Sequence, residues 1–516
     1  MDLDNATVAD LQAALAAGST TSAALVRGYL ARIAAIDQAG PRLNSVREIN
    51  PDAAALAAAS DAAPVRGPLE GIPILLKDNI ATADRQHTTA GSLALASARA
   101  HRDATVTAKL RAAGAVILGK ANLTEFANIL AVGMPSGYSS LGGQVLNPYA
   151  TAVDANAIPI VQPGGSSAGS AVAVAAGLCA AAIGSETSGS LLSPASQNGL
   201  VTVKPTVGLL SRAGILPISS SQDTAGPMTR TVRDAAILLT VLAGHDPQDP
   251  ATLAAPAPVD YVAQLDASGL KGARIGVPSD PADPGNDFYW RNLPPRSAAA
   301  MAEAIDVLHA EGAVIVRANI PTAGWIGGPG TDMAVLNRNP FSPQLHQIAR
   351  SPIVFLYELK HDLARYLRDW ASETEIRGLG DIIAFNTAHA QQALRFGQDL
   401  FLAADATRGD LSEPEYAAAR HSDLRSSRTL GLDAYMDAHR LDAVLFAGAT
   451  GAAIAARAGY PSVQVPAGFT AGADTPDHPI GATFAGRAWS EAVLLRLAYA
   501  YEQASLARRP PTLSRG

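Results

Sequence analysis

The sequence predicts an α/β protein built as one large domain. Short apolar runs typical of buried strands alternate with segments of helical periodicity along the whole chain. We find no linker of distinct composition and no repeat of fixed period that would divide it. Hydrophobic residues make up 48% of the chain and charged residues 16%, which is typical of a globular protein with a sizeable core. We therefore expect one unit rather than the roughly three domains that length alone would allow.

The first 65 residues are expected to form a peripheral helical region, followed by the main domain over residues 66–516. Ser22 is placed to cap a helix that carries Leu25, Tyr29 and Ile33 on one face.

An apolar strand over residues 71–79 contains Lys77 near its end. Such a lysine either reaches solvent at the sheet edge or is enclosed in a site, where burial would lower its pKa and allow it to act as a base. The next step is a helix capped by Asp103 and ending at Gly114, followed by a strand over residues 115–118.

The most distinctive stretch, residues 163–190, holds two glycine-flanked serine clusters. A strand over residues 158–161 is expected to lead into the first cluster, PGGSSAGS, and a buried helix over residues 171–183 to separate it from the second, GSETSGS. Glycine allows sharp turns that bring backbone N–H groups close to a ligand. A serine hydroxyl in such a turn has the parts of an acyl-transfer site, namely a nucleophile beside an oxyanion hole.

The second half of the chain is expected to contain an irregular region, then a mostly helical region, and then short strands. Residues 280–345 are rich in Gly, Pro, Asn and Trp, and we expect an irregular, variable region there that forms part of a substrate mouth. Residues 352–440 are predicted to be mostly helical. Short strands then return, and the chain ends in a helix over residues 491–507.

Composition and motifs argue against several classes of function. A net charge of −7 and a pI near 5.8 argue against nucleic acid or an anionic membrane as a partner. The single cysteine, Cys179, excludes an intramolecular disulfide and a cysteine-based zinc site. The segment from Gly114 to Lys120 fails as a phosphate loop because Ala121 replaces the required Ser or Thr. Since the sequence also has no H-E-x-x-H motif and no set of cysteine ligands, no cofactor and no metal is expected. Residues 1–5 lack the features of a secretory signal, which favours a cytoplasmic protein or a mature form whose signal was removed.

Two serine sites compete. Ser167 lies in a G-x-S-x-G pattern, and downstream residues such as Asp306 and His389 could complete an esterase triad in the order that α/β-hydrolases use. The pattern is weak, because small-residue turns match it by chance. The other site combines Lys77, Ser166 and Ser190, with Lys204 as an alternative cation that we assign a structural role.

The second site is part of a wider resemblance to the amidase signature family. Successive motifs match in the family's order and cover most of the chain: Gly71–Asn79, Gly119–Ala127, Gly164–Ser170, Glu186–Ser190, Lys204–Gly208, Asp223–Pro227, Ala458–Val463 and Ala488–Gln503. The sequence resembles most the branch of peptide amidases, aryl-acylamidases and urethanases. The resemblance implies a central mixed β-sheet covered by helices on both faces.

It also implies a Ser-cisSer-Lys triad. Ser190 would be the nucleophile, Ser166 would follow a cis peptide bond and relay the proton, and Lys77 would be the base. The backbone N–H groups of Thr187, Ser188 and Gly189, with that of Ser190 itself, would form the oxyanion hole. The remaining motif residues expected to support the site are Gly164, Gly165, Ser167, Asp223 and Thr224.

Hydrolysis of carbon–nitrogen bonds through an acyl-enzyme is the implied function, on C-terminal peptide amides or anilides and, by the same route, carbamates. We identify no arginine suited to hold a substrate carboxylate, which favours a neutral, apolar small molecule as the partner; a homodimer stays open. Two alternatives also stay open: an esterase using Ser167 with a histidine, and a non-catalytic binding protein on the same scaffold.

Three positions depart from the family pattern. Glu186 stands where aspartate is usual, Ser188 where glycine or aspartate is usual, and Leu192 where arginine is frequent. Residues 151–161 resemble an inserted loop just before the proton relay. These departures are expected to change the hydrogen-bond network around the nucleophile and the shape of the substrate mouth.

Overall fold

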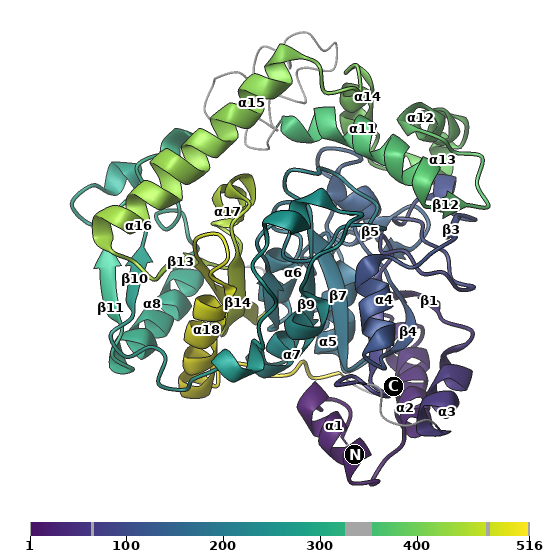
Figure 1. Cartoon of the computed structure of the whole chain (residues 1–516), viewed down its shortest axis with the longest axis horizontal. Helices are drawn as coiled ribbons and strands as arrows, with labels where there is room; N and C mark the ends of the chain where they lie inside the picture. The colour runs from purple at the N-terminus through teal and green to yellow at the C-terminus, as the bar shows by residue number, and fades with distance from the viewer. Residues whose placement is uncertain (1, 63–66, 326–352, 471–474, 514–516) are drawn as a thin grey trace.

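A mixed sheet of eleven strands runs through the molecule, with helices flanking it (Figure 1). The computed structural model describes residues 2–62, 67–325, 353–470 and 475–513. In sheet order the strands are β1 (Val46–Ile49), β4 (Val116–Ala121), β2 (Pro73–Lys77), β7 (Ala181–Glu186), β9 (Thr224–Thr229), β8 (Val201–Lys204), β14 (Ser462–Thr470), β15 (His478–Ala485), β13 (Ala443–Ala447), β10 (Arg274–Val277) and β11 (Val314–Arg317). Two small sheets pair β3 (Arg99–Ala100) with β12 (Ala371–Ser372) and β5 (Tyr138–Ser139) with β6 (Gly143–Gln144).

The described helices fall into groups that Figure 1 separates clearly, with α1–α3 at the bottom and α11–α15 across the top. The first half of the chain forms α1 (Val8–Ala16), α2 (Ser22–Arg32), α3 (Ala53–Ala62), α4 (Thr105–Ala112), α5 (Ala168–Ala175), α6 (Leu192–Gln197) and α7 (Val232–Leu242). The second half forms α8 (Pro295–Ala310), α11 (Val354–Asp369), α12 (Leu379–Ala388), α13 (Ala390–Ala393), α14 (Asp399–Asp405), α15 (Pro414–Leu424), α16 (Asp433–His439), α17 (Ala452–Ala458) and α18 (Glu491–Ser505). Within the described ranges, no helix has the length and apolar character needed to span a membrane.

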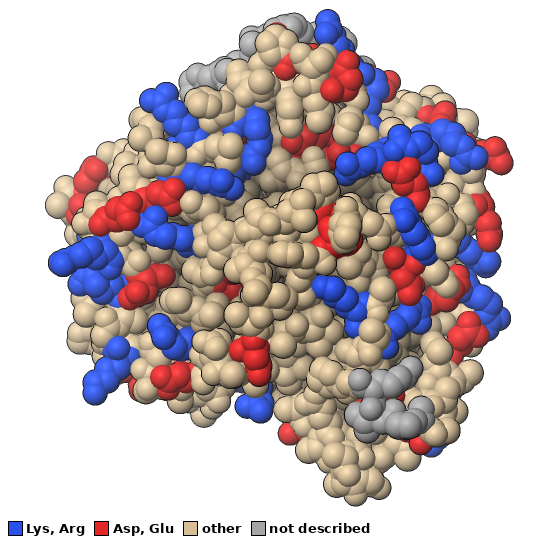
Figure 2. All heavy atoms as spheres, in the orientation of Figure 1, with Lys and Arg blue, Asp and Glu red and all other residues tan. Residues whose placement is uncertain are grey.

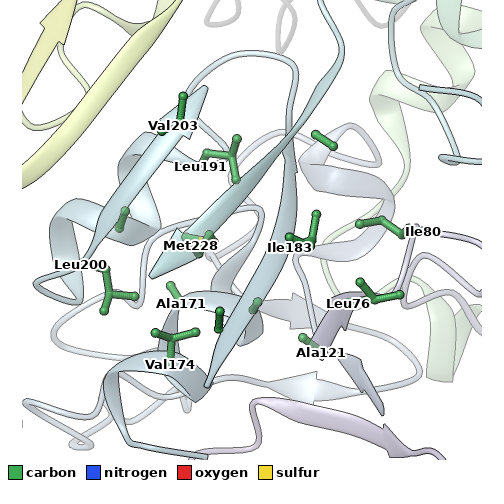
Figure 3. Close-up of a cluster of buried hydrophobic side chains, with 14 of the residues drawn as sticks. Leu76, Ile80, Ala121, Ala171, Val174, Ile183, Leu191, Leu200, Val203 and Met228 are labelled. Carbon is green, nitrogen blue, oxygen red and sulfur yellow. The ribbon is translucent and has the colours of Figure 1, made fainter. Parts of the chain in front are cut away.

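The arrangement of β4, β2 and β7 determines where the site can form. β2 pairs in parallel with both neighbours, so the carboxyl ends of all three strands lie at one edge of the sheet. Behind them the core is wholly buried, and Figure 3 shows Leu76, Ile183 and Met228 of the strands together with Ala171 and Val174 of α5. Lys77 lies at the end of β2, and the chain that leads to Ser190 leaves β7 after Glu186. Both therefore extend from strands that the packed core holds in place.

The predicted fold class, a mixed sheet with flanking helices, is confirmed. The N-terminal region, predicted to be helical and peripheral, contains α1–α3 and also contributes one strand to the sheet, because β1 pairs antiparallel with β4. The cap of α2 also differs: the Thr21 side chain accepts from the Ala24 N–H, whereas the Ser22 hydroxyl donates to the carbonyl of Gly71.

The helix predicted over residues 171–183 is wrong in its extent. α5 covers Ala168–Ala175, Gly177 turns the chain with a φ of 66°, and Ala181 begins β7. The apolar small residues fit either a helix or a buried strand, so their pattern could not separate the two. The serine clusters are therefore joined by a short helix and a strand.

The strand predicted over residues 158–161 is also absent. Pro159 forms only an isolated bridge to Val153, and the Asp154 carboxylate accepts N–H bonds from Asn156 and Ile158, which closes a local loop. Proline cannot donate to a sheet ladder, which accounts for the difference. Residues 151–161 thus form a loop, and Arg395 donates to its Asn156 carbonyl.

Asp103 does not cap α4, whose first residue follows Ala104 without a side-chain cap. The Asp103 carboxylate instead accepts from the Ala83 N–H and pairs with Arg111.

Residues 280–345 are less irregular than predicted. α8 spans Pro295–Ala310, and β11 pairs in parallel with β10. Residues 326–345 lie outside the described part of the chain. The predicted helical region after residue 352 and the C-terminal helix are confirmed in the described residues, although α18 ends at Ser505.

Candidate active site

Lys77 is wholly buried at the end of β2 and lies against two serines. Its Nζ is 2.8 Å from the Ser166 Oγ, 3.0 Å from the Ser185 Oγ and 3.1 Å from the Ser185 carbonyl oxygen. Burial lowers the pKa of Lys77 from 10.5 to about 7, against the opposing effect of the Asp223 and Glu186 carboxylates. Near pH 7 the neutral and protonated forms of the amine are therefore present in comparable amounts, and the neutral form prevails at higher pH.

A neutral amine at this position is suited to accept a proton from Ser166. It carries two N–H donors and one lone pair. The Ser185 carbonyl can only accept, and the Ser185 hydroxyl oxygen also receives a bond from the Asn79 Nδ2, 2.9 Å away. With its two N–H groups directed to Ser185, the amine keeps its lone pair for the Ser166 hydroxyl.

Ser166 lies in a tightly enclosed turn, and the Gly165–Ser166 peptide bond is cis. The Ser166 carbonyl accepts from the Thr124 N–H at 3.1 Å. A Cβ on Gly164 would lie 2.5 Å from the Pro194 Cα, and one on Gly165 would lie 2.6 Å from the Thr124 Oγ1. Both glycines are therefore required by close packing, and Gly164 also has a φ of 69°.

Ser190 lies beside this turn, because the Ser167 N–H donates to the Ser190 carbonyl at 3.1 Å. Its residue surface is 6% exposed. Within the described residues we find no hydrogen bond to the Ser190 hydroxyl, so the Lys77–Ser166 link is formed in this structure and a Ser166–Ser190 bond is not. Catalytic hydrogen bonds are often long before substrate binds and shorten in the complex.

The backbone before Ser190 has the features expected of an oxyanion hole. Gly189 has a φ of 85°, and among the described residues we find no acceptor for the N–H groups of Thr187, Ser188 and Gly189. The Thr187 hydroxyl donates to the Asp223 carboxylate at 2.5 Å. Burial raises the pKa of Asp223 to about 6, although the bonds from Thr187 and from two backbone N–H groups counteract it.

Glu186, which stands where aspartate is usual in the family, holds the backbone that follows Ser190. Its carboxylate accepts from the N–H groups of Leu191 at 2.7 Å and Leu192 at 3.0 Å. It thus orients the chain that leaves Ser190 and enters α6. Leu192 itself is fully buried, and Thr224 opposes Glu186 in the β7–β9 ladder.

The rival site is not assembled. The Ser167 hydroxyl donates to the Ser185 carbonyl at 3.0 Å and accepts from the Ser185 N–H at 3.3 Å. The His389 ring instead stacks on Phe385 and bonds its carbonyl. Lys204, the alternative cation, is buried with its Nζ 2.7 Å from the Tyr460 carbonyl, in keeping with a structural role.

A cavity of about 390 Å³ adjoins the Lys77 site. Its lining includes Ser185, Asn79 and Thr187, together with Tyr366 of α11 and Trp370, which directly follows that helix. Lys77, Ser166 and Ser190 are not among the lining residues. Sequence reasoning missed Ser185 as a Lys77 partner and missed the whole contribution of α11. Ser185 lies next to a recognised motif, but no signal in the sequence links α11 to the site.

The part of the chain that the structure describes contains no group of three or more His, Cys, Asp or Glu side chains arranged to hold a metal ion.

Comparison with known proteins identifies the family of the chain. A family model described as Amidase matches residues 24–495. The chain is similar to the crystal structure of native peptide amidase from Stenotrophomonas maltophilia, with a TM-score of 0.85, 45% identity and 98% of each chain covered. It is also similar to an amidase family protein from Bacillus anthracis, with a TM-score of 0.85, 33% identity and coverage of 99% of this chain and 93% of that one. A probable amidase of Arabidopsis thaliana is 37% identical over 99% of this chain and 92% of its own. The chain belongs to the amidase signature family.

Proposed function

We propose that this protein is a serine amidase in which Ser190 attacks the substrate carbonyl, Ser166 relays the proton and Lys77 accepts it. The observation that carries this proposal is the 2.8 Å contact between the Lys77 Nζ and the Ser166 Oγ, made by a fully buried lysine whose pKa is lowered to about 7. Ser–Lys pairs are an established alternative to histidine for activating a serine.

In the proposed reaction, proton transfer and bond formation occur together. The Ser190 oxygen attacks the carbonyl carbon as its proton passes to Ser166, while the Ser166 proton passes to Lys77. The N–H groups of residues 187–190 stabilise the negative oxygen of the tetrahedral intermediate. The proton then returns through Ser166 to the leaving nitrogen, the carbon–nitrogen bond breaks, and water hydrolyses the acyl-enzyme by the same relay.

Charged residues of both signs line the cavity, namely Arg102, Arg212, Arg365, Asp223, Asp249, Asp362 and Asp369. The Arg212 guanidinium is held by the Asp249 carboxylate at 2.6 and 2.7 Å and also donates to the Ser220 carbonyl. Because the positive and negative groups nearly balance, the lining favours a substrate without net charge. The adjoining wall, residues 213–218, is mostly apolar. We propose C-terminal peptide amides and anilides as substrates, with aryl carbamates accepted by the same route; the likeness to a peptide amidase supports the first class.

A turnover screen tests this proposal directly. We expect hydrolysis of a peptide C-terminal amide and an anilide, with an aryl carbamate cleaved more slowly, and loss of all three activities in Ser190→Ala. A simple ester serves as the comparison substrate, because esters are intrinsically easier to cleave. Turnover of the ester alone, retained in Ser190→Ala, would contradict the proposal.

Trp370 is expected to contribute to the binding of aromatic groups. It is 7% exposed, lines the cavity and carries the Arg102 guanidinium 3.9 Å from its ring centroid. Replacing Trp370 with alanine should raise KM for an anilide by about tenfold, since a stacked aromatic contact contributes about 0.5–1.5 kcal/mol beyond its buried area. Steady-state kinetics on the anilide and on a short primary amide check this, and an equal rise in KM for both substrates would argue against it.

A further inference from the structure

Helix α11 places two buried carboxylates against a loop of three consecutive serines. The Glu358 carboxylate accepts from the Ser219 hydroxyl, from the Ser221 N–H at 3.1 Å and from the Ser221 hydroxyl at 2.9 Å. The Asp362 carboxylate accepts from the Ser220 N–H at 2.8 Å. Since both carboxylates are at most 2% exposed, these bonds form away from bulk solvent.

The same loop holds a residue of the candidate oxyanion hole. One Asp223 oxygen accepts from the N–H groups of Ile218 and Ser219, both at 2.9 Å. The other accepts from the Thr187 hydroxyl at 2.5 Å. An unbroken series of hydrogen bonds thus runs from Glu358 through Ser219 and Asp223 to Thr187.

Glu358 is also held by a second helix, α15. Its second oxygen accepts from the Tyr416 hydroxyl of α15 at 2.7 Å. Glu358 and Ser219 are 139 positions apart in the sequence, so tertiary packing alone brings them together. In Figure 1, α11 and α15 both lie across the top of the molecule, while the strands that carry the site lie below them.

We propose that Glu358 is a positioning residue for amide hydrolysis. It holds the loop of residues 218–223 in place and, through Asp223, sets the orientation of the Thr187 N–H toward the substrate oxygen. This inference rests on the proposed function. A donor that points at the developing oxyanion stabilises the transition state more than the bound substrate, so its misalignment lowers kcat while KM changes little.

Three variants test this inference in the full chain. Glu358→Ala removes every acceptor and should lower kcat for a peptide amide by about 10- to 100-fold, with KM within about threefold. Glu358→Gln keeps an acceptor oxygen for the loop and an amide for Tyr416, and should recover most of kcat. Asp234→Ala is the matched control, because this buried carboxylate accepts from the N–H groups of Val8 and Ala9 on a different part of the fold. Its thermal stability should fall while kcat stays within about twofold.

The kcat values of these variants decide whether Glu358 has the positioning role. Unchanged kcat in Glu358→Ala, or an equal loss in Asp234→Ala, overturns the positioning role and leaves the proposed function intact. A parent protein whose turnover does not depend on Ser190 overturns both. If Glu358→Ala does not fold, the double variant Ser219→Ala, Ser221→Ala tests the same role, because it removes the two hydroxyls that donate to Glu358 and retains the carboxylate. A drop in kcat of at least fivefold supports the positioning role of Glu358. A smaller drop overturns it.

Discussion

Ser190→Ala is expected to reduce kcat by about 10⁶-fold, because without the hydroxyl no acyl-enzyme can form. The hydroxyl is the only side-chain group of Ser190 that the proposed reaction uses, so alanine removes the nucleophile and keeps the backbone N–H of the oxyanion hole and the carbonyl that accepts from the Ser167 N–H. Steady-state hydrolysis of a peptide amide measures the loss.

Ser167→Ala is the matched control, because the Ser167 N–H donates to the Ser190 carbonyl and the two serines therefore lie side by side. The Ser167 hydroxyl is engaged by the Ser185 backbone on both its donor and its acceptor side. Its removal should lower stability modestly and leave more than about a tenth of kcat, since the net contribution of such a hydrogen bond is about 0.5–1.5 kcal/mol. The esterase alternative requires the reverse order of effects, with Ser167→Ala inactive and Ser190→Ala active.

Lys77→Met is expected to lower kcat roughly 10³-fold, within the range that a positioned general base contributes. Methionine nearly fills the lysine volume and suits a buried site, so the variant should stay folded. Lys204→Met is the control, because Lys204 is equally buried but bonds the Tyr460 carbonyl. Comparable kcat losses in the two variants would show that the effect of Lys77→Met is not specific to proton transfer.

The same lysine fixes the direction of the pH dependence. With the pKa of Lys77 lowered to about 7, the amine is protonated and inactive below that pH and neutral above it. The activity of the parent protein, measured as kcat/KM, should therefore rise with pH through an inflection near 7, and a profile already flat from about pH 5 would contradict the assignment. Stability should also increase with pH from about 7 to about 10, because the unfolded chain binds the Lys77 proton more tightly than the folded chain does.

Sequence reasoning predicted the fold where the residue pattern had only one physical solution. The apolar run ending at Lys77 is β2, and the periodic segment after residue 352 is helical. It failed for residues 171–183, where alanine, glycine and valine satisfy a buried helix and a buried strand equally well. It also failed at β11, whose pairing with β10 depends on contacts distant in sequence.

The residues of the candidate site were also predictable only in part. Motif order brought Lys77, Ser166 and Ser190 into one hypothesis, and the structure brings the first two into contact. The role of Glu186 in orienting the N–H groups after Ser190 could not be predicted, because it depends on how the chain folds back so that the N–H groups of Leu191 and Leu192 reach this carboxylate. The α11 contacts could not be predicted either, since nothing local to residue 358 indicates a partner at residue 219.

The roles of Ser190 and Lys77 can be measured together by covalent labelling of the full chain with a fluorophosphonate, followed by intact-mass and peptide mass spectrometry across a pH series. We expect a single adduct on Ser190, a labelling rate that rises through an inflection near pH 7, and a loss of both rate and inflection in Lys77→Met. An adduct on Ser167, or a rate on Ser190 that is unchanged by Lys77→Met, would overturn the assignment of these residues.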